Sequence, residues 1–143
     1  MRDDMPDPSS LKDMDRAAQR LAEAISNGER VTVFGDYDVD GATSAAALKR
    51  YFEMVDGTLE VYVPDRLREG YGPSAAALER IAANGAQIVV TVDCGIAAHH
   101  ALAAGAAVGL EVIVVDHHTA EPALPPALAV VNPNRLDQEP GLG

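Results

Sequence analysis

Three aspartates at alternating positions follow a short apolar run, and this stretch constrains the chain more than any other. Residues 31–41 read VTVFGDYDVDG, in which the β-branched residues predict a strand and Asp36, Asp38 and Asp40 come directly after it. These carboxylates repel one another unless a positive charge lies among them. Because hard divalent cations bind carboxylate oxygens, the stretch predicts a metal site. A solvated acidic loop is the plainer alternative, since Asp and Gly are also common turn residues.

Strand patterns alternate with helical patterns along the rest of the chain. Helices are expected at residues 11–26, 42–52, 74–83 and 96–104, and Ser9 or Ser10 is available as the N-cap of the first. Strands are expected at residues 30–35, 59–63, 87–92, 111–115 and 128–131, and residues 65–72 are expected to form a loop. This alternation is typical of βαβ units, so the predicted fold class is α/β with a parallel sheet.

Length and composition favour one globular domain. The 143 residues are 48% hydrophobic, with two Phe and no Trp, so the core is expected to consist of Ala, Val, Leu and Ile. Residues 1–10 are acidic and contain two prolines, which predicts a flexible lead-in; the domain is expected at residues 11–135 and a tail without periodicity at 136–143.

The charge and the single cysteine narrow the classes of function. A formal net charge of −11 argues against a surface that holds nucleic acid with Lys and Arg, so a phosphate substrate would be bound largely through metal. One cysteine, Cys94, excludes a disulfide framework and fits a reducing compartment. With no signal-peptide pattern and no long apolar run, the chain is predicted to be cytoplasmic and to have no membrane partner.

Acidic or imidazole side chains follow three of the predicted strands. Besides the three aspartates after the first strand, Asp93 follows the third, and the triplet 116–118, which reads DHH, follows the fourth. The carboxyl ends of parallel strands lie on one edge of a sheet, so these residues are expected to converge. Carboxylates with imidazoles and no thiolate suit Mn²⁺ or Mg²⁺. Several carboxylates also suggest two ions, with Asp93 as the bridge, and therefore phosphoester hydrolysis.

These motifs resemble those of a known family. The segments VFGDYDVDGATS, EGYG, TVDCGI, VDHH and VNPNR are similar, in this order, to motifs of the DHH phosphoesterase superfamily, and within it to the exonucleases that digest single-stranded DNA from 5′ to 3′ in recombination and repair. The resemblance implies a three-layer fold, in which helices cover both faces of a mostly parallel five-stranded sheet, and a centre of two Mn²⁺ or Mg²⁺ ions.

The resemblance also implies roles for single residues. The metal ligands would be Asp38, Asp40, Asp93 and His117. His118 resembles the residue that contacts the scissile phosphate or supports the centre, and Asp36 and Asp116 are expected to orient the ligands through hydrogen bonds.

Two parts of the family pattern have no counterpart in this sequence. A fourth motif with a further metal-binding Asp is absent, and so are the second DHH-associated domain and the oligonucleotide-binding fold. The chain is therefore expected to be the N-terminal portion of a longer enzyme or a truncated gene product, which would meet single-stranded DNA through those C-terminal regions and act slowly or not at all alone. The sequence does not indicate an oligomeric state.

Four residues are candidates for contact with the substrate. Arg66 and Arg68 are placed to meet substrate phosphates or to pair with surface acids. Tyr71 is expected either to stack on a base or to fix its loop. Asn132 is expected to shape the loop under the site, or to contact water bound to the metal.

Two alternative functions stay open at this point. The first is a DHH-type phosphatase that acts on nanoRNA, a bisphosphonucleotide or pyrophosphate. Such relatives carry a histidine four residues before the first ligand aspartate, where this chain has Phe34. The second is an inactive scaffold that keeps the fold for protein interaction.

Overall fold

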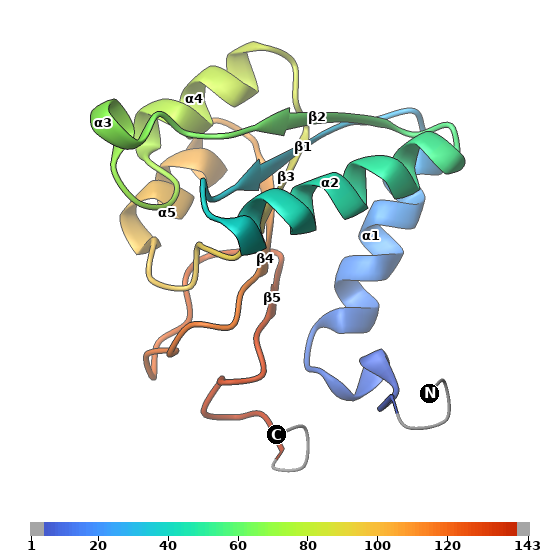
Figure 1. The fold of residues 1–143 in the computed structure, drawn as a ribbon, viewed down its shortest axis with the longest axis vertical. Coiled ribbons are helices and arrows are strands. Elements are labelled where there is room, and N and C mark those ends of the chain that lie inside the picture. Colours follow the sequence, from blue (N-terminus) through green and yellow to red (C-terminus); the bar gives the residue numbers. More distant parts are fainter. Residues whose placement is uncertain (1–4, 140–143) are drawn as a thin grey trace.

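Five parallel strands run through the centre of the protein in the order β2-β1-β3-β4-β5 (Figure 1). The computed structural model describes residues 5–139. The strands are β1 (Arg30–Gly35), β2 (Thr58–Tyr62), β3 (Ile88–Val92), β4 (Glu111–Val115) and β5 (Ala129–Val131). Every neighbouring pair is parallel, and in the centre Val33 of β1 is in register with Val90 of β3. The predicted parallel five-stranded sheet is confirmed.

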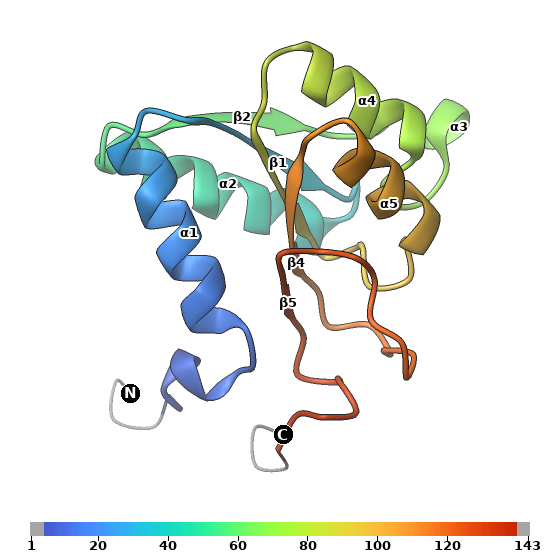
Figure 2. The same ribbon diagram turned by 180° about the vertical axis from the view of Figure 1, so that it is seen from behind.

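Helices cover both faces of this sheet (Figure 2). The helices α1 (Met14–Ser26) and α2 (Val39–Met54) lie on one face, and α4 (Ala75–Ala83) and α5 (His99–Ala107) lie on the other. Alternation along β1 serves both layers, because Val31 and Val33 pack toward α1 and α2 whereas Phe34 packs toward α4 and α5. The three-layer α/β fold that the sequence predicts is confirmed.

Small residues bring α4 and α5 close together. A Cβ at Gly105 of α5 would lie 3.0 Å from a methyl carbon of Leu78 on α4. An alanine-rich core with few aromatic side chains requires such close approach, since contact between elements must replace the bulk of large side chains.

The strand order places a topological switch point between β1 and β3. The connection from β1 through α2 leads to β2 on one side, whereas the connection from β3 through α5 leads to β4 on the other. Open α/β sheets bind ligands outside the carboxyl ends of the strands at such a point. The aspartates after β1 and β3 therefore lie where the topology favours a site.

The helices α2 and α5 start at positions other than the predicted ones. The helix α2 begins at Val39, three residues before the predicted start, because Asp38 caps it through a hydrogen bond from the Gly41 N–H to Oδ1 (2.9 Å). The helix α5 begins at His99 rather than at residue 96, because the Asp116 carboxylate accepts the Ile96 N–H (3.1 Å) and holds the preceding segment outside the helix.

A short helix, α3 (Arg66–Glu69), lies within the predicted loop 65–72. Asp65 caps it by accepting the Leu67 N–H (2.9 Å), and Glu69 reaches back to accept the Asp65 N–H (2.7 Å). The charged sequence gives no apolar periodicity, so these reciprocal hydrogen bonds were not predicted.

The first helix also starts later than predicted, at Met14 rather than at residue 11. Neither Ser9 nor Ser10 is its N-cap, since both belong to the short 3₁₀ helix η1 (Pro8–Ser10), which Asp7 caps. Asp13, with φ of 63°, separates the two helices and binds the far end of the chain: its Oδ2 accepts from the Val130 N–H (2.9 Å).

The predicted lead-in 1–10 and tail 136–143 extend beyond the described residues at both ends. Where the structure describes them, they contact each other, because Gln138 of the tail donates to the Ser10 carbonyl of the lead-in (3.0 Å). Gln138 also accepts the N–H of Lys12, which follows the lead-in (2.9 Å). The division of the chain at these boundaries stays a prediction. Among the described residues, no helix has the length and apolar character needed to cross a membrane.

Candidate metal centre

The first part of the site is the connection from β1 to α2. Asp36 is 2% exposed, and its carboxylate accepts the Tyr37 N–H (2.8 Å). Gly41 in the first turn of α2 lies against this residue, since a Cβ there would be 2.4 Å from the Asp36 carbonyl oxygen. The glycine of the motif thus allows the helix start to approach the end of the strand, with Asp36, Asp38 and Asp40 at the junction.

The second part is the tight turn after β3. Asp93 has φ of 60°, a left-handed conformation that is uncommon outside glycine and is found at functional sites. Its N–H donates to the Val115 carbonyl (3.0 Å), and Gly95 follows with φ of 110°. Cys94 between them is fully buried, and burial together with the surrounding carboxylates raises the pKa of its thiol. The turn therefore places Asp93 at the site and keeps the thiol of Cys94 in the core.

The third part is the segment after β4. Asp116 is 5% exposed and accepts N–H groups from Ile96 (3.1 Å), His117 (2.8 Å) and His118 (3.2 Å). Burial by itself would raise the pKa of Asp116, but the hydrogen bond from the His118 imidazole and these N–H groups lower it below its ordinary value. Asp116 is thus an ionised support for both histidines.

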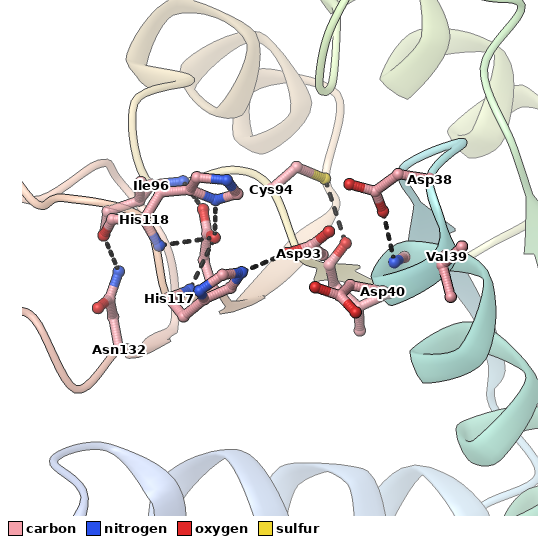
Figure 3. A network of polar contacts seen from close by, with 12 residues as sticks. Asp38, Val39, Asp40, Asp93, Cys94, Ile96, His117, His118 and Asn132 are labelled. Atoms are coloured by element: carbon pink, nitrogen blue, oxygen red, sulfur yellow. Dashed lines mark hydrogen bonds and ion pairs between the residues drawn. The ribbon is translucent and has the colours of Figure 1, made fainter. Parts of the chain in front are cut away.

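The three parts converge (Figure 3). Two groups of side chains, Asp36–Asp38–Asp93 and Asp93–His117–His118, place ligand atoms within 4.8 Å of one another. Asp93 belongs to both groups, as expected for the central strand end, and its Oδ1 lies 2.7 Å from His117 Nε2. Asp40 belongs to neither group, but it lines a cleft of about 370 Å³ with Asp93, Asp116 and His117. The site thus combines carboxylates from β1 and β3 with histidines from β4.

The structure places Asp36 closer to the centre than its predicted supporting role required. Its carboxylate is grouped with those of Asp38 and Asp93, whereas Asp40, predicted as a ligand, lies on the wall of the cleft. The period of two in D-x-D-x-D does not continue after Asp38, because α2 begins at Val39 and turns Asp40 by a helical step.

Two of these carboxyl groups oppose each other. Burial and the neighbouring Asp38 raise the pKa of Asp93, against the effect of His117. The Gly41 N–H and the contact with Asp93 lower the pKa of Asp38. Two adjacent carboxyl groups with pKa values pushed apart favour either a shared proton or a bound cation. Oxygen-rich ligands with imidazole and no thiolate fit Mn²⁺ or Mg²⁺.

The candidate substrate residues lie around this centre. Tyr71 donates a hydrogen bond to the Asp93 carbonyl (3.3 Å), and its ring meets the His118 ring edge to face at 6.0 Å. Arg66 stacks its guanidinium over the Tyr37 ring at 4.8 Å from the centroid, and Arg68 lies 3.8 Å from Asp65. Tyr71 therefore has the loop-fixing contact, and Arg68 the acidic neighbour, that were considered as alternatives to substrate binding.

Two residues near the site were not singled out from the sequence. Glu69 accepts hydrogen bonds from the Tyr62 hydroxyl, Arg80 and the Asp65 N–H, and so ties the loop of Arg66 to the core. Asn134 donates to the His117 carbonyl. Asn134 lies in the quoted segment VNPNR, so this motif could have indicated it. Glu69 lies in the segment EGYG, which by itself does not indicate its hydrogen bonds.

A comparison with protein families gives a match that covers most of the chain. The model of the DHH family, N-terminal domain, matches residues 30–143. The chain belongs to the DHH family. The match of this DHH domain begins at β1 and includes all three parts of the site.

Curated relatives of the domain are single-stranded-DNA-specific exonucleases named RecJ. The protein of Bacillus subtilis is 40% identical over 132 residues, which are 92% of this chain and 17% of the relative. The protein of Thermus thermophilus is 38% identical over 138 residues, 93% of this chain and 20% of the relative. The chain thus spans about a fifth of the length of these relatives.

Solved structures agree with these relatives. A crystal structure of exonuclease RecJ bound to manganese has a TM-score of 0.82 at 38% identity, covering 94% of this chain and 34% of that one. RecJ from Thermus thermophilus in complex with Mn²⁺ has a TM-score of 0.72 at 36% identity, covering 90% and 18%. CDC45 from Entamoeba histolytica shares the fold alone, with a TM-score of 0.58 at 12% identity over 84% and 24%.

Proposed function

We propose that this DHH domain is the catalytic part of a metal-dependent exonuclease that hydrolyses single-stranded DNA from the 5′ end. The observation that carries the proposal is the convergence of Asp36, Asp38, Asp93, His117 and His118 at the switch point of the sheet. Relatives of 35–40% identity, named for this activity, support it. The polarity, the substrate and the cytoplasmic setting belong to the proposal, because the chain spans only a fifth of those relatives.

Asp38, Asp40, Asp93 and His117 would hold Mn²⁺ or Mg²⁺, with Asp36 placed beside them. Two such ions, when bound, supply activation of a water and neutralise the negative charge that develops on the phosphoryl group. Asp93 would be the residue available to both ions, since it belongs to both groups of side chains.

The proposed role of His118 is that of a hydrogen-bond donor to the substrate. Its Nδ1 is hydrogen-bonded to Asp116 Oδ1 (2.6 Å), and this bond raises the pKa of the imidazole. With Nδ1 occupied by the carboxylate, Nε2 is the nitrogen that can meet a substrate. A protonated His118 would donate from Nε2 to an oxygen of the scissile phosphate, while Asp116 keeps the ring in place.

The remaining contacts to DNA are assigned to the loop 65–72. Arg66, held over the Tyr37 ring, and the largely exposed Arg68 would meet backbone phosphates, and Tyr71 would stack on the terminal nucleotide. The net charge of −11 gives the chain little other attraction for a polyanion, so the affinity at the scissile phosphate would depend on the metal ions.

The environment of Phe34 disfavours the small-substrate phosphatase. Relatives of that kind would have a histidine ligand at this position, but Phe34 is fully buried and stacks on Tyr62 with 5.3 Å between ring centroids. Its side chain belongs to the core under α4 and α5.

The test measures Mn²⁺ binding and hydrolysis with the same protein. Electron paramagnetic resonance of free Mn²⁺ gives the affinity of the wild type and of Asp93→Ala, and digestion is followed on 5′-phosphorylated single-stranded DNA beside duplex DNA, short RNA and pyrophosphate. We expect Mn²⁺ binding that Asp93→Ala weakens by about 100-fold or more, since loss of a residue that only orients a ligand costs about 10–100-fold. Hydrolysis by this chain alone should be slow and should release mononucleotides from single-stranded DNA. Unchanged binding in Asp93→Ala would show that the centre is wrongly assigned. Preferential release of phosphate from pyrophosphate would support the phosphatase instead.

A further inference from the structure

Two asparagines after β5 bind the main chain of the two histidines. Asn132 Nδ2 donates to the His118 carbonyl at 3.0 Å (Figure 3), and Asn134 Nδ2 donates to the His117 carbonyl. The two residues are also bonded to each other, because the Asn134 N–H donates to Asn132 Oδ1 at 2.7 Å. We call Asn132 and Asn134 the asparagine clamp.

The clamp completes a set of hydrogen bonds around the histidines. The N–H groups of His117 and His118 both donate to Asp116 Oδ1, at 2.8 and 3.2 Å. The four main-chain polar groups of the two histidines are therefore all held by side chains, two by Asp116 and two by the clamp. No sheet ladder fixes this segment, since β4 ends at Val115.

The two imidazoles are only partly covered, with ring contacts between Tyr71 and His118 and between the two histidines. The side chains of His117 and His118 are 60% and 47% exposed. Each ring has one carboxylate partner, Asp93 for His117 and Asp116 for His118. If the backbone were mobile, these exposed rings would move away from their carboxylate partners. The hydrogen bonds that hold the His117 and His118 carbonyls are therefore more important for ring position than they would be in a buried segment.

The clamp itself is anchored on the opposite side of β5. Arg135, 9% exposed, donates to the Val130 carbonyl (2.8 Å) and to Asp13 Oδ2 (3.0 Å). The same Asp13 oxygen accepts the Val130 N–H. The turn before α1 thus fixes the segment that carries the clamp, although Asp13 is far from the site in sequence.

We infer that Asn132 and Asn134 are positioning residues, which hold the backbone of His117 and His118 so that the imidazoles meet the metal and the phosphate. Asn132 is fully buried and its amide binds both His118 and Asn134, so it acts from beneath the site. The inference deepens the proposed function and rests on it for the reaction, but the clamp geometry is independent of the substrate.

The test uses Asn134→Ala, because Asn134 is exposed and its loss removes one hydrogen bond without a core cavity. Asn84→Ala is the matched control, since Asn84 is an exposed asparagine at the end of α4, on the opposite edge of the sheet. Asn134→Gln keeps the amide and tests rescue. Mn²⁺ affinity, the ¹H–¹⁵N signals of both imidazoles in the metal-free chain, and the melting temperature are measured for each.

We expect Asn134→Ala to weaken Mn²⁺ binding by about tenfold, the lower range for loss of a hydrogen bond that orients a ligand. The His117 imidazole signals should shift, the melting temperature should match that of Asn84→Ala, and Asn134→Gln should recover part of the affinity. Wild-type affinity together with unshifted imidazole signals in Asn134→Ala would overturn the inference. If the wild type binds no Mn²⁺, the proposed function fails. The clamp is then tested by the imidazole signals alone, which should still differ between the metal-free wild type and Asn134→Ala.

Discussion

The acidic residues at the two edges of the sheet differ in whether a Lys or Arg of the protein binds them. At the amino edge, Arg20 donates to both oxygens of Glu29 at 2.8 Å and to both oxygens of Glu111 at 3.0 and 3.1 Å. At the carboxyl edge, the aspartates of the site have no Lys or Arg partner among the described residues, and their ion-pair partners there are His117 and His118.

This difference separates a structural cluster from a binding site. At the amino edge, one forked guanidinium binds the oxygens of both Glu29 and Glu111, so these carboxylates already have a cationic partner within the protein. At the carboxyl edge, Asp36, Asp38 and Asp93 are brought together without such a charge. We call the amino-edge cluster closed, because a cation of the protein binds it, and the carboxyl-edge cluster open, because no Lys or Arg among the described residues does. The open cluster lies at the switch point of the sheet.

The largest expected effect is the response of the carboxyl edge to metal. With free Mn²⁺ at a hundredfold excess over its Kd, the free energy of unfolding should rise by about 2.7 kcal/mol, because the ion binds the folded chain alone. Thermal or urea unfolding with and without Mn²⁺ measures the gain, and a chelator should abolish it.

The control for this effect is Asp93→Asn, which should lose the gain while the metal-free chain remains at least as stable as the wild type. Burial and Asp38 raise the pKa of Asp93 in the folded chain, so its ionised form costs folding stability at a pH above that pKa, and the neutral amide removes this cost. An unchanged stabilisation by Mn²⁺ in Asp93→Asn would contradict the open-cluster interpretation.

The next effect is expected at the amino edge. Arg20→Met should lower the free energy of unfolding by about 2 kcal/mol, since it leaves Glu29, 17% exposed, without its cation. The Mn²⁺ affinity of this variant should equal that of the wild type. A loss of metal affinity would show that the two edges are coupled, contrary to the comparison.

The ion pair between Arg20 and Glu29 should also make the stability depend on pH. The hydrogen bonds from Arg20 lower the pKa of Glu29 in the folded chain, so its stabilising contribution is complete above about pH 4.5, the ordinary value for Glu, and is lost as the pH falls through the lowered pKa. Between pH 6 and 3, the metal-free wild type should lose more stability than Arg20→Met. Parallel curves for the two proteins would contradict this assignment.

The smallest effect is expected for an exposed pair at the same edge. Arg30 lies 2.7 Å from Glu60, but the two side chains are 47% and 58% exposed. Arg30→Gln should change the free energy of unfolding by about 0.5 kcal/mol or less, and the change should vanish at high salt. An effect as large as that of Arg20→Met would show that contact distance, rather than burial, decides the value of these pairs.

The sequence predicted most of the architecture because its signals are local. The β-branched runs predicted the five strands within one or two residues, and the acidic and imidazole residues after three of them predicted a site at one edge. The amino ends of α1, α2 and α5 were each wrong by three residues, and α3 was missed. The caps from Asp38 on α2 and Asp65 on α3, and the hydrogen bond from the Ile96 N–H to Asp116 before α5, override the apolar periodicity. The start of α1 is displaced because η1 and the left-handed Asp13 precede Met14.

By itself, the sequence determined the α/β class, the candidate residues and the edge at which they meet, because strand periodicity and chain direction follow from neighbouring residues. Only the tertiary structure decided how these residues are held. It placed Asp36 with Asp38 and Asp93, moved Asp40 to the cleft wall, and brought Asn132 and Asn134 under the histidines. These contacts join separate strands and loops, so they depend on packing that no local pattern encodes.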